Sequence, residues 1–140
     1  QQEMDYRHQD LYKEALKAQQ KSYSPYSHFA VGCVIALEDG TMVHGANIEN
    51  ASYGATICAE RVAMCNALIN SKEKGTHVDQ VAIIGPSSDC ITPCGICRQF
   101  LREFVPLKTP IVLFNQGGTK SKVTSLETLL PDSFGPDHLH

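Results

Sequence analysis

Residues 81–114 read VAIIGPSSDCITPCGICRQFLREFVPLKTPIVLF, and the pattern of this stretch decides the fold. The apolar runs at its two ends, VAIIG and IVLF, have the length and composition of buried strands. Between them, Thr92 and Pro93 mark a helix start, because threonine caps helices and proline suits their first position. Pro106 limits the other end of that helix. A strand–helix–strand unit predicts parallel strands if the two strands are neighbours in one sheet.

The chain before this unit is expected to form a helix, a hairpin and a second helix. DLYKEALKAQQKS (10–22) reads as a helix, and its narrow apolar face consists of Leu11, Ala15, Leu16 and Ala18. AVGCVIAL (30–37) and TMVHGANI (41–48) flank Asp39-Gly40, a dipeptide typical of hairpin turns, so we expect an antiparallel pair. ICAERVAMCNALINSKEKG (57–75) reads as a helix that ends at Gly75.

The residues after IVLF are expected to complete the same domain. NQGG (115–118) reads as a turn and KVT (122–124) as a short strand, while Thr124 and Glu127 have the spacing of a capping box for a final helix. The element order predicts a three-layer α/β/α fold with a mixed five-stranded sheet. A chain of 140 residues has the size of one domain, 1–140, and we expect 1–9 and 136–140 to be loosely ordered ends.

The composition argues against several classes of protein. A net charge of −3 does not suit a nucleic-acid-binding or anionic-membrane surface, and no apolar run is long enough to span a bilayer. The opening residues, QQEMDYRHQD, lack the apolar segment of a signal peptide. Without a secretory signal, the six cysteines favour metal or redox chemistry over a disulfide framework. The cytoplasm is the expected location, with the nucleus as an additional candidate.

Three cysteines stand where helices are expected to begin. Cys58 opens one helix, and Cys94 and Cys97 form a CxxC at the start of another. The free N–H groups and the dipole at a helix start favour thiolate over thiol. If both helix starts face one point, three thiolates hold a zinc ion and leave its fourth position open to water, as in catalytic sites.

Two other interpretations of the CxxC remain open. It is compatible with a thioredoxin-like redox pair, although such a pair needs neither Cys58 nor Glu60. It is also compatible with a structural zinc site, for which Cys90, Cys65 or a histidine would supply the fourth ligand. Cys33 and Cys65 lie in apolar runs and are expected to be small core residues.

Glu60 and Arg61 follow Cys58 closely enough to share its site. Glu60 is too near Cys58 to be a comfortable second ligand, but it can carry protons between zinc-bound water and a substrate. Alone, it would read as a first-turn glutamate that complements the helix dipole. Three thiolates and one Zn²⁺ leave a charge of about −1, which an arginine such as Arg61 can offset by donating to a thiolate. Arg61 is otherwise an exposed arginine, and Arg98 is a second candidate for its task.

These motifs resemble those of the zinc deaminases, in which a histidine or cysteine, one residue and a glutamate precede a later Pro-Cys-x-x-Cys. CAE and PCGIC match that signature. Over most of its length the chain is similar to the small homotetrameric cytidine deaminases, through YSPYSHFAVG, GANIENASY, ICAER, TPCGICRQF and LLPDSFGP in this order. The resemblance implies that Cys58, Cys94 and Cys97 hold one zinc ion per chain and that Glu60 is the proton shuttle. It also implies that Arg61 tempers the thiolates.

The resemblance further implies the residues that contact the nucleoside. Phe29 would pack against the pyrimidine, Asn47 and Glu49 would bond the ribose 3′-hydroxyl, and Ala59 would offer backbone groups to the base. Three residues would approach the nucleoside of a neighbouring subunit in a homotetramer with shared sites: Ala51, Tyr53 and Phe134. By pattern alone, Phe29 reads as a core aromatic, Asn47 as a loop former and the C-terminal residues as a frayed tail.

The expected reaction is zinc-dependent hydrolytic deamination of cytidine and deoxycytidine to uridine and deoxyuridine, with release of ammonia, in pyrimidine salvage. The expected partners are a small pyrimidine nucleoside and further copies of the chain, without a membrane. Polynucleotide is not expected, because the contact of Glu49 with a 3′-hydroxyl suits a substrate that carries no 3′-phosphate. The alternatives are a deaminase of a nucleoside-like antibiotic such as blasticidin S, an editing deaminase, and a binding module with structural zinc.

Overall fold

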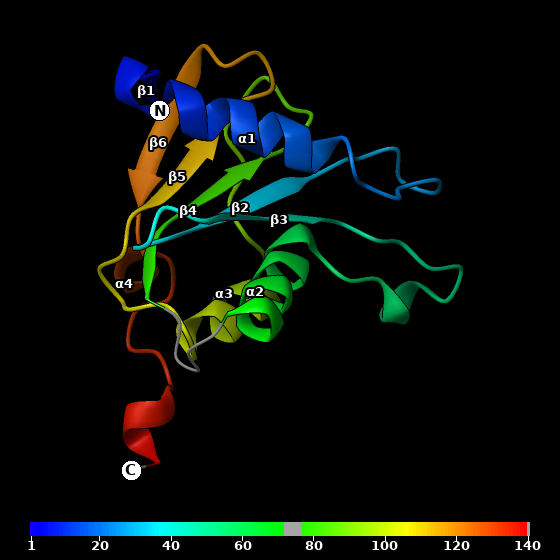
Figure 1. Cartoon of the computed structure of the whole chain (residues 1–140). Helices are drawn as coiled ribbons and strands as arrows, with labels where there is room; N and C mark the ends of the chain where they lie inside the picture. The colour runs from blue at the N-terminus through cyan, green and yellow to red at the C-terminus, as the bar shows by residue number, and fades with distance from the viewer. Residues whose placement is uncertain (72–76, 140) are drawn as a thin grey trace.

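A single sheet lies between helices in the computed structural model, which describes residues 1–71 and 77–139 (Figure 1). The strands are β1 (Gln2–Glu3), β2 (Gly32–Leu37), β3 (Met42–Ala46), β4 (Val78–Ile84), β5 (Ile111–Phe114) and β6 (Lys120–Thr124). The α-helices are α1 (Gln9–Gln19), α2 (Ala59–Asn70), α3 (Gly95–Arg102) and α4 (Leu126–Leu129). Three 3-10 helices accompany them: η1 (Tyr6–His8), η2 (Tyr53–Ala55) and η3 (Pro136–His138). None of the helices in these residues combines the length and apolar character that crossing a membrane requires.

The sheet is mixed, as expected, but its described part has six strands instead of five. Their order is β1-β6-β5-β4-β2-β3. The additional strand, β1, pairs antiparallel with β6 at the sheet edge through only two residues. Two exposed polar residues carry no alternation of apolar and polar side chains, so the sequence gives no strand signal there.

The strand directions confirm the expected pairings. β2 and β3 form the antiparallel hairpin, in which Gly40 takes a positive φ of 91° at the turn. β4 and β5, which flank α3, are parallel neighbours, with Val81 opposite Ile111. β3 and β4 flank α2 but are not neighbours, because β2 lies between them and pairs antiparallel with both.

The helices cover both faces of the sheet, which confirms the three layers (Figure 1). Successive strand residues point to opposite faces, so alternate residues enter different cores. On one face, α1 packs on a core that contains Val34, Ala82, Ile84, Val112 and Phe114. On the other face, α2 and α3 pack on Cys33, Ile35, Val81, Ile83, Ile111 and Leu113.

The helix ends differ from the expected positions. α2 already ends at Asn70, and Gly75, the predicted end, lies outside the described residues. α3 is capped by Cys94 and begins at Gly95, so the predicted start at Thr92 and Pro93 is wrong. Thr92 and Pro93 stay in the loop, where both accept hydrogen bonds from the Arg98 side chain.

The cap of the last helix also differs from the expected one. Ser125, and not Thr124, caps α4, because its hydroxyl accepts a hydrogen bond from the backbone N–H of Thr128. Thr124 instead ends β6 in register with Ile111 of β5. The proposed capping box was therefore placed one residue too early.

Gly45 sets how closely α2 lies on the sheet, which leads to a prediction on stability. A Cβ atom on Gly45 would lie 2.3 Å from the Ala63 nitrogen and 2.5 Å from the Ala59 oxygen, both in the backbone of α2. We expect Gly45→Ala to lower the free energy of unfolding by at least about 2 kcal/mol, because backbone cannot yield to the clash. Urea unfolding measures this change.

Gly117→Ala is the matched control. A Cβ atom there would meet nothing within 4 Å, and Gly117 does not have a positive φ. Its unfolding free energy should change by less than about 0.5 kcal/mol. Equal stabilities of the two variants would show that the α2–β3 approach is not tight.

Candidate active site

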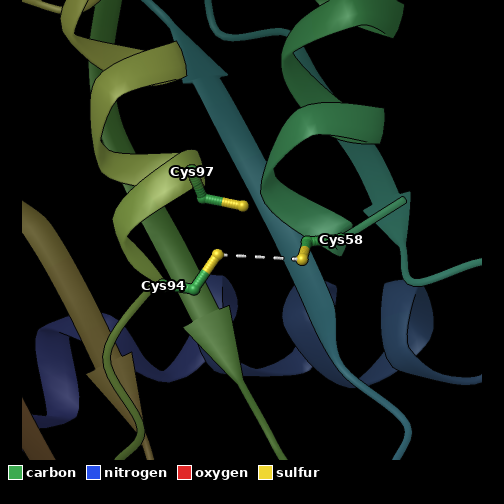
Figure 2. A group of neighbouring side chains, drawn as sticks. All are labelled: Cys58, Cys94 and Cys97. Carbon is green, nitrogen blue, oxygen red and sulfur yellow. Dashed lines mark hydrogen bonds between the residues drawn. The ribbon is translucent and has the colours of Figure 1, made fainter. Parts of the chain in front are cut away.

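The N-termini of α2 and α3 bring three sulfur atoms together. Cys58 is the N-cap of α2, Cys94 is the N-cap of α3, and Cys97 lies in the first turn of α3. Their Sγ atoms all lie within 4.8 Å of one another, and those of Cys58 and Cys94 are 3.9 Å apart. Figure 2 shows the three side chains pointing toward one another from the two helix starts. The predicted cluster is therefore formed.

The geometry and chemistry of this cluster fit a zinc ion. Tetrahedral coordination with zinc–sulfur bonds of about 2.3 Å places neighbouring sulfurs about 3.8 Å apart. The Sγ atoms of Cys58 and Cys94, which are 3.9 Å apart, lie close to that spacing. Thiolates are soft ligands that favour zinc over magnesium or calcium. Three ligands leave the fourth position available to water.

The other cysteines lie elsewhere in the described part of the chain. Cys33 is fully buried in the core, as expected. Cys65 is exposed on α2, so the expectation that it is a core residue was wrong. Cys90 is half-buried, and its thiol donates to the Leu113 carbonyl at 3.4 Å. Among the residues described, none of these cysteines joins the cluster as a fourth ligand.

The thiols of the cluster differ in their protonation. A hydrogen bond from Cys97 lowers the pKa of Cys58 to about 5, and hydrogen bonds from Arg61 and Cys94 act in the same direction. The bond with Cys58 raises the pKa of Cys97, and burial of Cys97 raises it further. Cys58 is thus a thiolate at neutral pH, and Cys97 keeps a proton that a bound cation would displace.

Glu60 lies beside the sulfur atoms as the second residue of α2. Only 4% of Glu60 is exposed, although glutamate is an ionisable residue that is usually found at the surface. Burial raises the pKa of its carboxyl, and the negative charge of Cys58 raises it further. A carboxyl whose pKa moves toward neutrality can both accept and release a proton at physiological pH. This property goes beyond what a first-turn glutamate needs to complement a helix dipole.

Arg61 contacts the cluster directly. Its Nη2 donates to the Cys58 sulfur at 3.5 Å, and this bond raises the pKa of Arg61. Its Nε is buried and, within the described residues, has no hydrogen-bond partner, which leaves one donor free inside the site. Arg61 is therefore not a simple surface arginine.

Arg98 does not share this position. Its side chain donates to the Pro93 and Leu129 carbonyls at 2.7 and 2.8 Å and also to Thr92. It therefore ties the loop before Cys94 to the end of α4. The suggestion that it offsets the thiolate charge was wrong.

The loop that precedes β2 is bonded to the loop that follows β3. Asn47 donates from Nδ2 to the Phe29 carbonyl at 2.8 Å and accepts from the Val31 N–H at 2.9 Å. Phe29 is 41% exposed, so the alternative reading as a core aromatic is wrong. The structure thus places Phe29 and Asn47 together in this loop pair, with Phe29 exposed and Asn47 partly buried.

Glu49 is fixed in the same loop pair by a residue that the sequence analysis missed. The Ser27 hydroxyl donates to Glu49 and holds its pKa below the ordinary value, and the Tyr26 and Ser27 N–H groups also donate to its carboxylate. The Ser27 hydroxyl in turn accepts from the Phe29 N–H at 3.0 Å. The motif YSPYSHF contains this hydroxyl, and serine in such loops commonly bonds to nearby backbone.

The remaining predicted residues lie in three places. Ala59 is buried at the start of α2, next to Cys58. Ala51 and Tyr53 are exposed near η2, where Tyr53 makes an edge-to-face contact with Tyr26. Phe134 is exposed in the C-terminal segment. In Figure 1, the loop that carries η2 extends to the right of the sheet, whereas the C-terminal segment extends below it.

Comparisons with known proteins agree with this site. Residues 5–113 match the family described as "Cytidine and deoxycytidylate deaminase zinc-binding region". The chain is 39% identical over 132 residues to a cytidine deaminase of Halalkalibacterium halodurans, covering 94% of this chain and 97% of that protein. It is 37% identical over 126 residues to a probable cytidine deaminase of Dictyostelium discoideum, covering 89% of this chain and 82% of the relative.

Solved structures give the same result. The crystal structure of cytidine deaminase from Burkholderia pseudomallei matches with a TM-score of 0.85 and 42% identity, over 91% of this chain and 98% of that one. The cytidine deaminase of Mycobacterium tuberculosis matches with a TM-score of 0.72 and 34% identity, over 88% and 93% of the two chains. With its cysteine cluster and its three-layer fold, the chain belongs to the cytidine deaminase family.

Proposed function

We propose that this chain catalyses the hydrolytic deamination of cytidine and deoxycytidine to uridine and deoxyuridine, with one zinc ion per chain. The observation that carries the proposal is the meeting of three cysteine sulfurs with the buried carboxyl of Glu60 at the start of α2. Metal ligation needs the sulfurs, and proton transfer needs the carboxyl. A structural zinc site or a redox pair requires no buried glutamate with a raised pKa.

Cys58, Cys94 and Cys97 would hold the zinc ion. When bound, zinc in such a site lowers the pKa of water to about 7 and so supplies a nucleophile at neutral pH. Arg61 donates to the Cys58 sulfur and withdraws part of the thiolate charge, which would otherwise oppose that lowering.

Glu60 would move the protons of the reaction. Its carboxylate takes one proton from the attacking water and delivers it to N3 of the pyrimidine as the water oxygen bonds to C4. Glu60 then passes the second proton of the water to the amino group, the C4–N bond breaks, and ammonia leaves as the C4 carbonyl forms. Each transfer needs a carboxyl that both accepts and releases a proton, and burial raises the pKa of Glu60 in the direction that favours proton uptake.

Phe29, Asn47 and Glu49 would hold the nucleoside, and Ala59 would offer backbone groups to the base. The Nδ2 group of Asn47 has two N–H donors, and its bond to Phe29 uses one of them. Glu49 stays ionised and is an acceptor for a hydroxyl, whereas a phosphate in the same place would be repelled. This charge supports a free nucleoside as the substrate over a polynucleotide.

We also propose that the active enzyme is a homotetramer in which Ala51, Tyr53 and Phe134 approach the nucleoside of a neighbouring copy. The η2 loop and the C-terminal segment extend away from each other in one chain, which supports a site shared between copies (Figure 1). The three thiols of the cluster must stay reduced to bind zinc, which supports the cytoplasm, and in addition the nucleus, as the location. The reaction would serve pyrimidine salvage there.

Glu60→Gln tests the role of the carboxyl. Glutamine has nearly the same shape, but its amide neither takes up nor releases a proton near neutral pH. The variant should therefore bind about one zinc ion per chain while turnover falls by at least about 100-fold. Zinc content by atomic emission and cytidine loss by ultraviolet absorbance measure the two effects. Turnover near the wild-type rate would exclude Glu60 as the proton carrier.

Arg61→Gln tests the charge balance of the cluster. Loss of the cationic donor should raise the pKa of the Cys58 thiol, because the Arg61 hydrogen bond stabilises its thiolate. We expect weaker zinc retention against a chelator or turnover reduced by about tenfold. Arg61→Lys keeps the charge and should fall between wild type and Arg61→Gln; unchanged retention and kinetics in both would contradict the role.

The metal dependence of turnover separates the enzyme from a binding module with structural zinc. Cytidine should be lost in a zinc-replete sample and retained after a chelator removes the metal, with activity restored by added zinc. Circular dichroism of the stripped sample is the control for unfolding. A zinc-replete, folded sample that leaves both cytidine and deoxycytidine intact would refute the proposed function.

A further inference from the structure

Arg102, the last residue of α3, is a buried arginine that the deamination chemistry does not use. Only 9% of its side chain is exposed. Its Nε donates to the Ser133 hydroxyl at 2.7 Å, and its Nη2 donates to the Asp137 carboxylate at 2.8 Å. Burial of a guanidinium is unfavourable unless it is paired, so these contacts with the C-terminal segment are what make its position stable.

The backbone of the C-terminal segment passes directly over the Arg102 guanidinium. A Cβ atom on Gly135 would lie 2.3 Å from the Arg102 Cζ, so no larger residue fits without displacing the arginine. One turn earlier on α3, Gln99 donates from Nε2 to the Phe134 carbonyl at 2.9 Å. The side chains of Gln99 and Arg102 on α3 therefore hold residues 133–137 through hydrogen bonds to backbone and polar groups.

The Phe134 ring stays exposed although the backbone around it is held by these hydrogen bonds. Phe134 is 58% exposed, and its ring stacks on His138 with centroids 5.3 Å apart and an interplanar angle of 13°. The Gly135 N–H donates to the His138 Nδ1 at 3.0 Å and so closes the turn that carries both rings. If the segment only had to be attached to the domain, burial of its aromatic ring would be more favourable than burial of its polar groups.

We propose that Arg102 is a positioning residue that fixes the C-terminal segment so that Phe134 reaches the nucleoside bound in a neighbouring copy of the chain. This inference rests on the proposed function, which assigns Phe134 to a neighbouring site. Without the contacts of Arg102 with Ser133 and Asp137, the C-terminal segment would lose conformational freedom each time a nucleoside binds, and that entropy cost would weaken binding. The chemical step, which involves Glu60 and the cysteine cluster, would not change.

The test compares Arg102→Gln, Phe134→Ala and the double variant as zinc-loaded enzymes. Each single variant should raise the KM for cytidine by roughly 3- to 10-fold, the scale of ordering a side chain on binding, with zinc content and kcat close to wild type. Because Arg102 acts through Phe134, the double variant should have the KM of Phe134→Ala alone. Amide hydrogen exchange in residues 133–138 should accelerate in Arg102→Gln, while the rest of the chain keeps its rates.

Two further variants act as rescue and control. Arg102→Lys keeps the charge but bonds fewer partners, so its KM should lie between those of wild type and Arg102→Gln. Arg7→Gln breaks an arginine–aspartate pair with Asp5, of 2.6 Å, in the N-terminal segment and should leave KM unchanged. If Arg102→Gln does not fold, Ser133→Ala combined with Asp137→Ala removes both hydrogen-bond partners of Arg102 and should raise KM to the same degree.

Each other outcome overturns the positioning role. Faster exchange without a change in KM would make Arg102 an anchor with no effect on the site. If the KM increase of the double variant equals the product of the increases in the two single variants, Arg102 does not act through Phe134. Failure of the wild-type enzyme to deaminate cytidine would refute the proposed function itself, whereas wild-type turnover with a normal KM in Arg102→Gln would refute only this inference.

Discussion

The meeting of the α2 and α3 N-termini at one point is the constraint on which the site depends. The sulfur atoms of Cys58, Cys94 and Cys97 lie within 4.8 Å of one another although they come from helices that begin 36 residues apart. Both helices pack on the same face of the sheet. The α2 backbone lies close to β3, which is possible because Gly45 has no side chain. Helix starts offer free N–H groups that stabilise thiolates, so their convergence makes a cation site.

The order of residues at the start of α2 divides the chemical work among neighbours. Cys58 carries a thiolate that its hydrogen bonds stabilise, and Arg61 donates to that thiolate. Glu60, between them, is buried, so its carboxyl is pushed toward neutrality while the thiolate beside it stays charged. In the proposed function, this one helical turn supplies a metal ligand, a proton carrier and a charge-balancing cation. The carboxyl and the thiolate are acids whose pKa values are shifted in opposite directions.

Much of the fold and the core of the site follow from local sequence patterns. Apolar runs and Asp39-Gly40 predicted the central strands and the hairpin, and the cysteine spacing predicted the cluster. The β1 edge strand was missed because its pairing with β6 is set by tertiary contact and not by its own residues. Cys65 was misplaced because periodicity on α2, whose faces differ little in polarity, does not determine which face is buried. The single-domain limits stay a prediction.

The charge of the thiolates pointed to Arg61 from the sequence, but the partners of Arg98, Arg102 and the Ser27 hydroxyl depend on tertiary contacts that no local pattern predicts. Arg61, Arg98 and Arg102 look alike in the sequence, yet one donates to a sulfur, one braces a loop and one holds the C-terminal segment. X-ray absorption at the zinc edge of the purified enzyme tests the central claim of an open three-thiolate site most directly. We predict three sulfur ligands at about 2.3 Å and one lighter oxygen or nitrogen ligand. Four sulfur ligands would contradict the account, because a closed site has no position for the attacking water.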